Sequence, residues 1–484
     1  MFALLVGFLL LLAAADRTLF GIAAQAQAPQ GQSQQAPSAP NIVRVPVPRA
    51  DRAAPPSMTN HRCHIFPIQE GYGAKARGEP LIRPDCDYLH ERRDRARDHH
   101  GAVIELAPTD LNFHGGPVIG TAIHSFIFLN CSLSCWGNPF KFLSDLFIGL
   151  NIPFIHVSDQ YLNGIGSYTT SDSGIELAGT QPHTLTDSQL RALIMIGVKS
   201  AFPQGGGGGY NRMYSIFLPQ GQDLCFDNSK HCYCPDDNCN GGSFFFCAYH
   251  GSFDSTDAVG APIHVIYQAE PYHDVPGCQV TNGPNGSLID STNNVLSHEI
   301  FETITDPNLD AWWRDSDGLE IADICAWNLT NPISLNGAFY AIQKEYSNQL
   351  HECVSVPPTQ LELVKILVHP DSQHLRLFNL QIDGVTVRSN TNGGSTGPLT
   401  VTPGNHTVGE TGGTGTPLGV FEIVIGGSCA ADGTVNLGAG DSKICTITNY
   451  DHAGGCTPQR PVCCEPGDGQ NGCSRCIPLG NECP

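Results

Sequence analysis

The sequence predicts a large α/β (α+β) domain with a mixed sheet, followed by a small all-β sandwich and a disulfide-rich tail. Three observations support this prediction. Strand-like apolar runs alternate with helical apolar spacing over residues 61–357. Short β-rich runs separated by glycine, threonine and asparagine fill residues 358–450. Residues 451–484 are too few for a hydrophobic core and are rich in cysteine, so disulfides are expected to hold them together.

The first 60 residues are not expected to fold as a domain. Phe2–Ala15 is a nearly unbroken apolar run, and Ala26-Gln27-Ala28 resembles a cleavage site, so residues 1–28 are predicted to be a signal peptide. A membrane anchor is the rival interpretation, but the run is shorter than the ~20 residues of a spanning helix. We expect no transmembrane segment after signal removal. Residues 29–60 are rich in proline, glutamine and alanine and predict a disordered linker.

Strands are predicted at several places in the large domain. Ala122–Leu129, Met213–Leu218 and His264–Gln268 are apolar runs with the length of strands, and Ile155–Val157 predicts a further short strand. Strands that alternate with helices along a chain favour a mixed sheet.

Three helices are predicted between and after these strands. Phe140–Leu150 has helical apolar spacing. The sequence Thr-Asp-Ser-Gln at 186–189 has the form of a capping box and opens a helix that runs to about residue 201. A third helix is expected to begin near Asp290 or Ser291 and to end at Pro307.

The 20 cysteines divide evenly among the expected modules, with twelve in residues 61–357, two in 358–450 and six in 451–484. Even numbers favour disulfides and therefore a secreted, extracellular protein. The same reasoning favours disulfides over a zinc knuckle in the cysteine-rich insertion from Cys225 to Cys247. A formal net charge of −21 argues against nucleic acid as a partner, because such binding needs a basic surface.

The third predicted helix carries the principal candidate site. Residues four apart share a helix face, so His298 and Glu302 can reach one metal ion, with Glu299 beside them as the base that activates water. Either Glu320 or Asp323 supplies a third ligand. This pattern predicts a zinc-dependent peptidase or other hydrolase, with Ca²⁺ or another divalent cation as the alternative to Zn²⁺.

Two interpretations of this motif stay open. The arrangement differs from His-Glu-x-x-His because a carboxylate replaces the second imidazole, so water bound there would be less acidified than at a two-imidazole site. The alternative to a hydrolase is a buried hydrogen-bonded cluster or a non-catalytic cation site. Four further residues are candidates for lining the pocket: His114, Tyr249, His250 and Asp306.

The large domain resembles the secreted phosphate-induced (EXORDIUM-like) proteins, in particular their bacterial members. The resemblance covers about residues 61–356 and rests on five pieces: Phe113-His114-Gly115-Gly116-Pro117-Val118, Phe246-Cys247-Ala248-Tyr249-His250, the His298 helix with Asp306-Pro307 and Trp312, Glu320-Ile321-Ala322-Asp323-x-Cys325, and Gln343-x-Glu345-Tyr346-Ser347-Asn348. It implies an extracellular protein whose partner is a peptide or a cell-wall or cell-surface component, and which for the plant members acts in growth signalling.

The region 358–450 is similar to the prealbumin-like β-domains of bacterial surface proteins. The matching pieces are Gly404-Asn405-His406-Thr407-Val408, Gly427-Ser428-Cys429 and Cys445-Thr446-Ile447-Thr448-Asn449. This similarity implies a spacer or adhesion module in which a disulfide joins Cys429 to Cys445.

Overall fold

The structure is a computed structural model that describes residues 41–50, 59–69, 110–148, 154–226, 231–236, 239, 243–329, 331–368, 376–451, 462–466 and 473–477. The predicted signal peptide lies outside these residues, as does most of the predicted cysteine-rich tail. Among the helices of this described part, none has the length and apolar character needed to cross a membrane.

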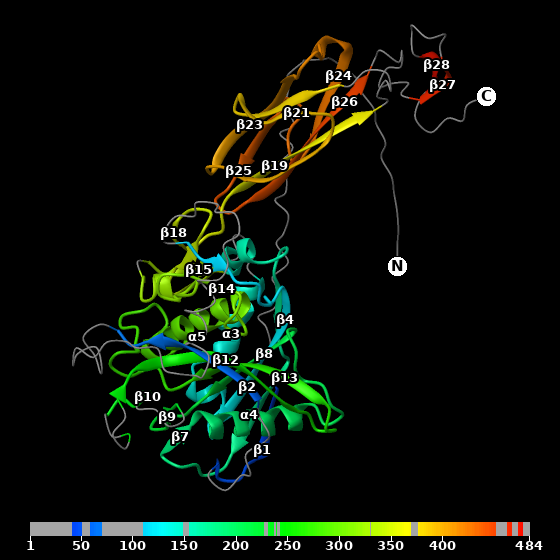
Figure 1. Cartoon of the computed structure of the whole chain (residues 1–484). Helices are drawn as coiled ribbons and strands as arrows, with labels where there is room; N and C mark the ends of the chain where they lie inside the picture. The colour runs from blue at the N-terminus through cyan, green and yellow to red at the C-terminus, as the bar shows by residue number, and fades with distance from the viewer. Residues whose placement is uncertain are drawn as a thin grey trace, which may run out of the picture. The chain divides into compact units, whose positions relative to one another are not determined.

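One eight-stranded sheet forms the centre of the large domain (Figure 1). Its strands are β1 (Asn41–Pro46), β2 (Thr59–Pro67), β4 (Thr121–Leu129), β5 (Ser167–Thr170), β6 (Ser173–Ala178), β8 (Arg212–Phe217), β12 (Phe246–Thr256) and β13 (Pro262–Glu270). Parallel pairing joins β1, β6, β4, β8 and β13 in that order, and β5 pairs in parallel with β4. β12 and β2 extend the sheet with antiparallel pairing, so the sheet is mixed, as predicted.

Both faces of this sheet are covered, which explains why its central strands are apolar on both sides. In β4, Phe126 and Phe128 face one core, which also contains apolar residues of α5 (Ser287–Thr305). Ile127 and Leu129 face the other core, together with α4 (Asp187–Ala201). Figure 1 shows α5 and α3 (Pro139–Ile148) on one side of the sheet and α4 on the other.

The predicted helices are present, with one shifted boundary. Thr186 accepts a hydrogen bond from the backbone N–H of Gln189 and completes the predicted capping box of α4. α5 begins at Ser287, a few residues earlier than expected. Asp290 lies inside the helix because its carboxylate accepts from the backbone N–H groups of Asn285 and Gly286, and thereby holds the segment before the first turn.

Two segments differ from the sequence prediction. Asn41–Pro46, which we expected in the linker, forms β1, because the segment is rich in β-branched residues and pairs with β6 along its full length. The segment predicted as a strand at Ile155–Val157 belongs to a 3-10 helix, Phe154–Tyr161. Its turns are supported by Ser158, whose hydroxyl donates to the carbonyl of Ile155, and a run of three apolar residues is too short to separate the two conformations.

Strand predominates over helix in the described residues, so the balanced alternation of an α/β domain is realised only in part. Smaller sheets account for much of this strand. They contain β3 (Asn112–Phe113), β7 (Thr184–Thr186), β9 (Asp223–Cys225), β10 (His231–Tyr233), β11 (Ser243–Phe244), β14 (Trp312–Trp313), β15 (Ile333–Leu335), β16 (Ala338–Tyr340), β17 (Glu345–Ser347) and β18 (Glu352–Val354).

Disulfides join neighbouring segments of the large domain, as the cysteine count predicted. The cysteine-rich insertion uses its cysteines in this way and not as a zinc knuckle. The pairs are Cys131–Cys135, Cys225–Cys232, Cys234–Cys239, Cys247–Cys278 and Cys325–Cys353. This chemistry is compatible with an oxidising compartment outside the cytosol.

Residues 360–368 and 376–451 form two four-stranded sheets that share one apolar core. One sheet contains β22 (Gly394–Thr400), β19 (Gln360–Val368), β26 (Ser442–Asp451) and β24 (Phe421–Gly427), and the other contains β21 (Val385–Thr391), β20 (Phe378–Ile382), β23 (Gly404–Gly412) and β25 (Thr434–Leu437). A disulfide joins Cys429 to Cys445, the pair that the resemblance implied. In the tail, β27 (Val462–Pro466) pairs with β28 (Cys473–Ile477).

A buried ion pair lies in the core between these two sheets. The ammonium of Lys365 is 2.8 Å from the carboxylate of Glu410, and both side chains are almost fully buried. Asn449 donates a hydrogen bond to the same carboxylate. Burial outweighs the attraction of Glu410 and lowers the pKa of Lys365, which shows how dry this environment is.

We predict that Glu410→Ala destabilises this pair of sheets by about 3–5 kcal/mol, because it leaves a buried lysine without its counter-charge. The matched control is Lys443→Ala, which breaks a half-exposed ion pair with Asp441 and should cost less than ~1 kcal/mol. Thermal unfolding of the two variants checks the difference. Equal, small shifts would show that the buried pair does not stabilise the sheets.

A second buried network ties the sheet to α5. His124 Nε2 lies 2.9 Å from the hydroxyl of Ser215 and 3.3 Å from Oε1 of Gln268. The Gln268 side-chain amide then donates to the Thr303 hydroxyl of α5 over 2.8 Å. Since His124 is fully buried, desolvation lowers its pKa from 6.5 to about 4.

We therefore predict that His124 makes stability depend on pH between about 6.5 and 4. The unfolded chain takes up the proton first as pH falls, so the free energy of unfolding should drop by up to about 3 kcal/mol across this window. His124→Gln keeps a neutral polar group and should remove that contribution. Denaturant unfolding of both proteins at a series of pH values measures it, and parallel pH profiles would contradict it.

Candidate metal centre

The polar face of α5 is buried against the sheet. His298, Glu299, Glu302 and Thr303 are each fully buried, as are most residues of the helix after its first turn. Charged side chains are rarely buried without partners, since removing them from water is costly. The partners of these groups come from two strands and a loop that are distant in sequence.

The strands contribute two histidines. His64 of β2 and His250 of β12 are direct cross-strand partners, with ring centroids 5.6 Å apart. Directly paired residues on neighbouring strands point to the same face, and the contacts of these two rings with Glu302 and Glu299 show that this is the α5 face. Gln268 is the partner of His250 on β13, and its bond to Thr303 holds α5 above this row.

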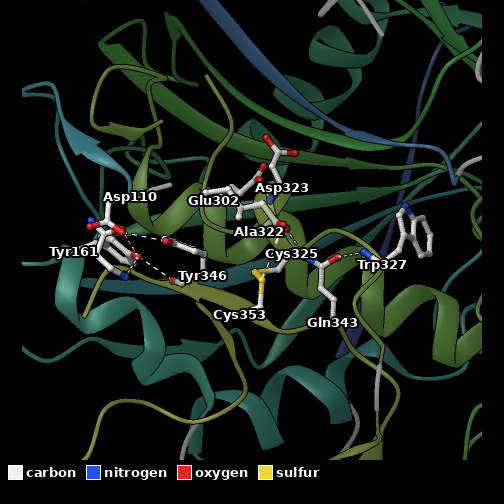
Figure 2. The surroundings of a disulfide bond; sticks show 12 residues. Asp110, Tyr161, Glu302, Ala322, Asp323, Cys325, Trp327, Gln343, Tyr346 and Cys353 are labelled. Carbon is white, nitrogen blue, oxygen red and sulfur yellow. Dashed lines mark hydrogen bonds between the residues drawn. A yellow bond between two sulfur atoms is a disulfide. The ribbon is translucent and has the colours of Figure 1, made fainter. Parts of the chain in front are cut away.

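The loop after α5 contributes two carboxylates. The backbone N–H of Asp323 donates to Oε1 of Glu302 over 3.1 Å, and the N–H of Glu320 donates to Oδ2 of Asp323, also over 3.1 Å. Figure 2 shows Asp323 and Glu302 next to each other at the top of this loop. These bonds set the loop against the helix.

A disulfide and a glutamine support the loop from below. Cys325, just after Asp323, is bonded to Cys353 (Figure 2). The side-chain amide of Gln343 donates to the carbonyl of Ala322 and accepts from the backbone N–H of Trp327. The carboxylates of the loop are therefore held by covalent and hydrogen-bonded neighbours before any ligand is considered.

Imidazoles and carboxylates converge at distances between 2.6 and 3.9 Å. His298 Nε2 lies 3.1 Å from Glu302 Oε1 and 3.8 Å from Asp323 Oδ1. His64 Nε2 lies 2.6 Å from Asp323 Oδ2 and 3.9 Å from Glu302 Oε2, and its Nδ1 lies 3.3 Å from Glu320 Oε1.

His250 completes the convergence. Its Nδ1 lies 3.5 Å from Glu302 Oε2 and 3.3 Å from Glu299 Oε2, and its Nε2 lies 3.7 Å from Glu320 Oε2. Ligand atoms around a tetrahedral zinc ion lie about 3.3 Å apart. Buried nitrogen and oxygen atoms at this spacing could hold a metal ion.

Several of these atoms lack a well-formed hydrogen bond within the described residues. They include both ring nitrogens of His298, Nε2 of His250, Oε1 of Glu299 and Oε2 of Glu302. The ring of His298 stacks on Phe66, with centroids 3.9 Å apart, which fixes its plane. Buried polar atoms are normally satisfied, so nitrogen and oxygen atoms with unused lone pairs fit a site that holds a cation.

The charges in the cluster shift one another's pKa values. Burial by itself opposes ionisation of His298, but Glu302 and then Asp323 outweigh it and raise the pKa of His298. Burial also opposes ionisation of Glu302, yet His298 and His64 hold its pKa well below the usual range. Burial and the neighbouring Glu302 carboxylate raise the pKa of Glu299 well above its ordinary value. These interactions keep Glu302 ionised and disfavour further negative charge in the cluster.

The structure brings together all four predicted ligands, His298, Glu302, Glu320 and Asp323, with Glu299 beside them. Sequence reasoning missed His64. This histidine lies about 230 residues before the helix motif and follows no ligand spacing, and only its pairing with His250 brings it to the site. The one signal in the sequence is the spacing of two residues between His64 and Phe66, which would place both side chains on the same face of a strand, opposite to Cys63 and Ile65.

Of the four pocket candidates, only His250 lies in the cluster. Tyr249 is next to it on β12, so it faces the other side of the sheet and donates to Asp187 of α4. His114 stacks on Trp313 and bonds to Asp315 in a partly exposed position. Asp306 ends α5 and accepts the backbone N–H of residue 311, which is the structural role of an Asp-Pro turn.

Comparison of this chain with models of protein families, with curated proteins and with solved structures finds no match.

Proposed function

We propose that this protein is a secreted metal-dependent hydrolase, with peptides as its favoured substrates and zinc as its metal. The observation that carries the proposal is the convergence of three histidines and three acidic ligands in one buried cluster beside Glu299. A bound divalent cation would polarise a carbonyl oxygen and lower the pKa of water. Disulfides in the large domain support the proposed extracellular location.

His298, Glu302 and either Glu320 or Asp323 would hold the ion, as the sequence motif suggested, and His64 and His250 lie within 4 Å of the same carboxylates. Imidazole and carboxylate ligands suit zinc, and calcium is less suitable because it prefers oxygen ligands alone. The Cys325–Cys353 disulfide and Gln343 position the loop carboxylates, and the Thr303–Gln268 bond positions the helix.

Glu299 is the proposed general base. One of its oxygens lies 3.3 Å from His250 Nδ1, and the other has no hydrogen-bond partner among the described residues. A carboxylate held at one oxygen and free at the other can accept a proton from a water molecule at the site. The resemblance to the EXORDIUM-like proteins, which implies an extracellular protein, supports the proposed location.

The second candidate function is a non-catalytic extracellular binding or signalling protein of the EXORDIUM-like type, in which the cluster is structural. The burial of the cluster favours it, since His64, His250, His298 and Glu302 are each at most 2% exposed. A peptide would need the surrounding loops to open before it reached the centre. The two functions make different demands on Glu299.

We predict that Glu299→Gln lowers hydrolysis of a fluorogenic peptide library by roughly 10²–10⁴-fold, because it removes the base. Bound metal and the melting temperature should stay close to wild type. The control is Glu352→Gln, an exposed carboxyl on β18, which should leave the rate unchanged. Metal-replete wild-type protein with no activity on any peptide would favour the binding protein.

We also predict that a chelator lowers the melting temperature of the large domain. The ion binds the folded cluster and not the unfolded chain. At a free metal concentration of 100 times Kd, its removal should therefore lower the free energy of unfolding by about 2.7 kcal/mol. His298→Ala should melt lower than wild type and respond less to the chelator. His183→Ala, at an exposed histidine, is the control. Calorimetry with and without chelator measures both effects, and a wild-type protein indifferent to chelation would contradict the metal site.

A further inference from the structure

The buried cluster contains more ligands than one ion uses. Glu299 aside, the cluster has three imidazoles and three carboxylates. Each imidazole lies within 4 Å of at least two of these carboxylates. A structural zinc ion takes four ligands and a catalytic one takes three with an open position. A single ion would therefore leave at least two of these buried side chains without a bond to the metal.

The ligand atoms also fall into separate sets. His298, Glu302 and Asp323 form one set, and His64, Glu302 and Glu320 form another, each with all its atoms within 4.8 Å. A third set joins His250 and Glu299 to Glu302. Glu302 belongs to every set, and its two oxygens face different partners: Oε1 lies 3.1 Å from His298, and Oε2 lies 3.5 Å from His250.

The charge of the cluster points the same way. The ligand carboxylates Glu302, Glu320 and Asp323 are all buried and carry a charge of −3 when they are ionised. One divalent cation compensates only two of these charges. Buried charge is tolerated only when it is compensated, so a second ion suits this set of ligands when the histidines are neutral.

We propose that the cluster is a binuclear centre in which Glu302 bridges two divalent cations. His298 and Asp323 bind the first ion with Oε1 of Glu302. His64 and Glu320 bind the second ion with Oε2 of Glu302, and His250 lies beside them, 3.5 Å from Glu302 Oε2 and 3.7 Å from Glu320 Oε2. Two-metal sites have ions about 3.5–4 Å apart and hold both the attacking and the leaving oxygen of a displacement. The proposal rests on the metal-binding part of the proposed function and deepens it.

The first test is the number of ions per chain. Purified full-length protein, dialysed against Zn²⁺ and then against metal-free buffer, should retain about two ions by mass spectrometry of the elements. His298→Ala and His64→Ala should each retain about one ion, because each removes a ligand of a different ion. Glu302→Gln should lose both, and the control His183→Ala should keep both.

The second test asks whether the ions share a ligand. Protein dialysed against Mn²⁺ should give a spin-coupled electron paramagnetic resonance spectrum, since two ions bridged by one carboxylate interact magnetically. Two ions with uncoupled spectra would overturn the bridge. This test and the wild-type metal count need no variant, so misfolding of a mutant cannot decide the outcome.

The outcomes separate this inference from the proposed function. About one ion in the wild type, lost completely in either histidine variant, would overturn the binuclear centre and leave a mononuclear hydrolase. No retained ion would overturn both, because the cluster would then be an arrangement of imidazolium and carboxylate groups. About two coupled ions, with one lost in each histidine variant, would establish the bridge.

Discussion

The central constraint on this protein is the burial of four carboxylates around three imidazoles at the interface between α5 and the sheet. Removing so many ionisable groups from water is unfavourable unless each finds an opposite charge or a cation. The surrounding structure is organised to hold them together. The sheet supplies His64 and His250, α5 supplies His298, Glu299 and Glu302, and the loop supplies Glu320 and Asp323.

Each of these three elements is held by contacts outside the cluster. The row from His124 through Gln268 to Thr303 joins the sheet to α5 with neutral hydrogen bonds. The Cys325–Cys353 disulfide and Gln343 hold the loop. Because these contacts do not use the cluster's own ligands, the ligand atoms are positioned in advance and can be spaced for a cation. Such preorganisation is the feature that a metal centre shares with a catalytic site.

The same burial separates the candidate functions. A cluster this deep has room for an ion, but it admits a peptide only if neighbouring loops move, because its side chains are buried. In the hydrolase, Glu299 is the chemically important residue. In the binding protein, it is one more charge that the cation neutralises. A binuclear centre is compatible with either function, because cations offset the buried carboxylate charge whether or not the site turns over a substrate.

The sequence by itself determined the local features. Helical spacing placed His298, Glu299 and Glu302 on one helix, the capping box placed the start of α4, and the even cysteine count predicted disulfides. These features depend on neighbours within a few residues, which is why pattern alone predicts them. Only the tertiary structure decided which distant residues join them. Strand register placed His64 opposite His250 and Tyr249 on the other face of the sheet. Pairing with β6 made a strand, β1, of a segment that we expected in the linker. Such pairings join residues that are far apart in the chain, so the local periodicity of the sequence cannot predict them.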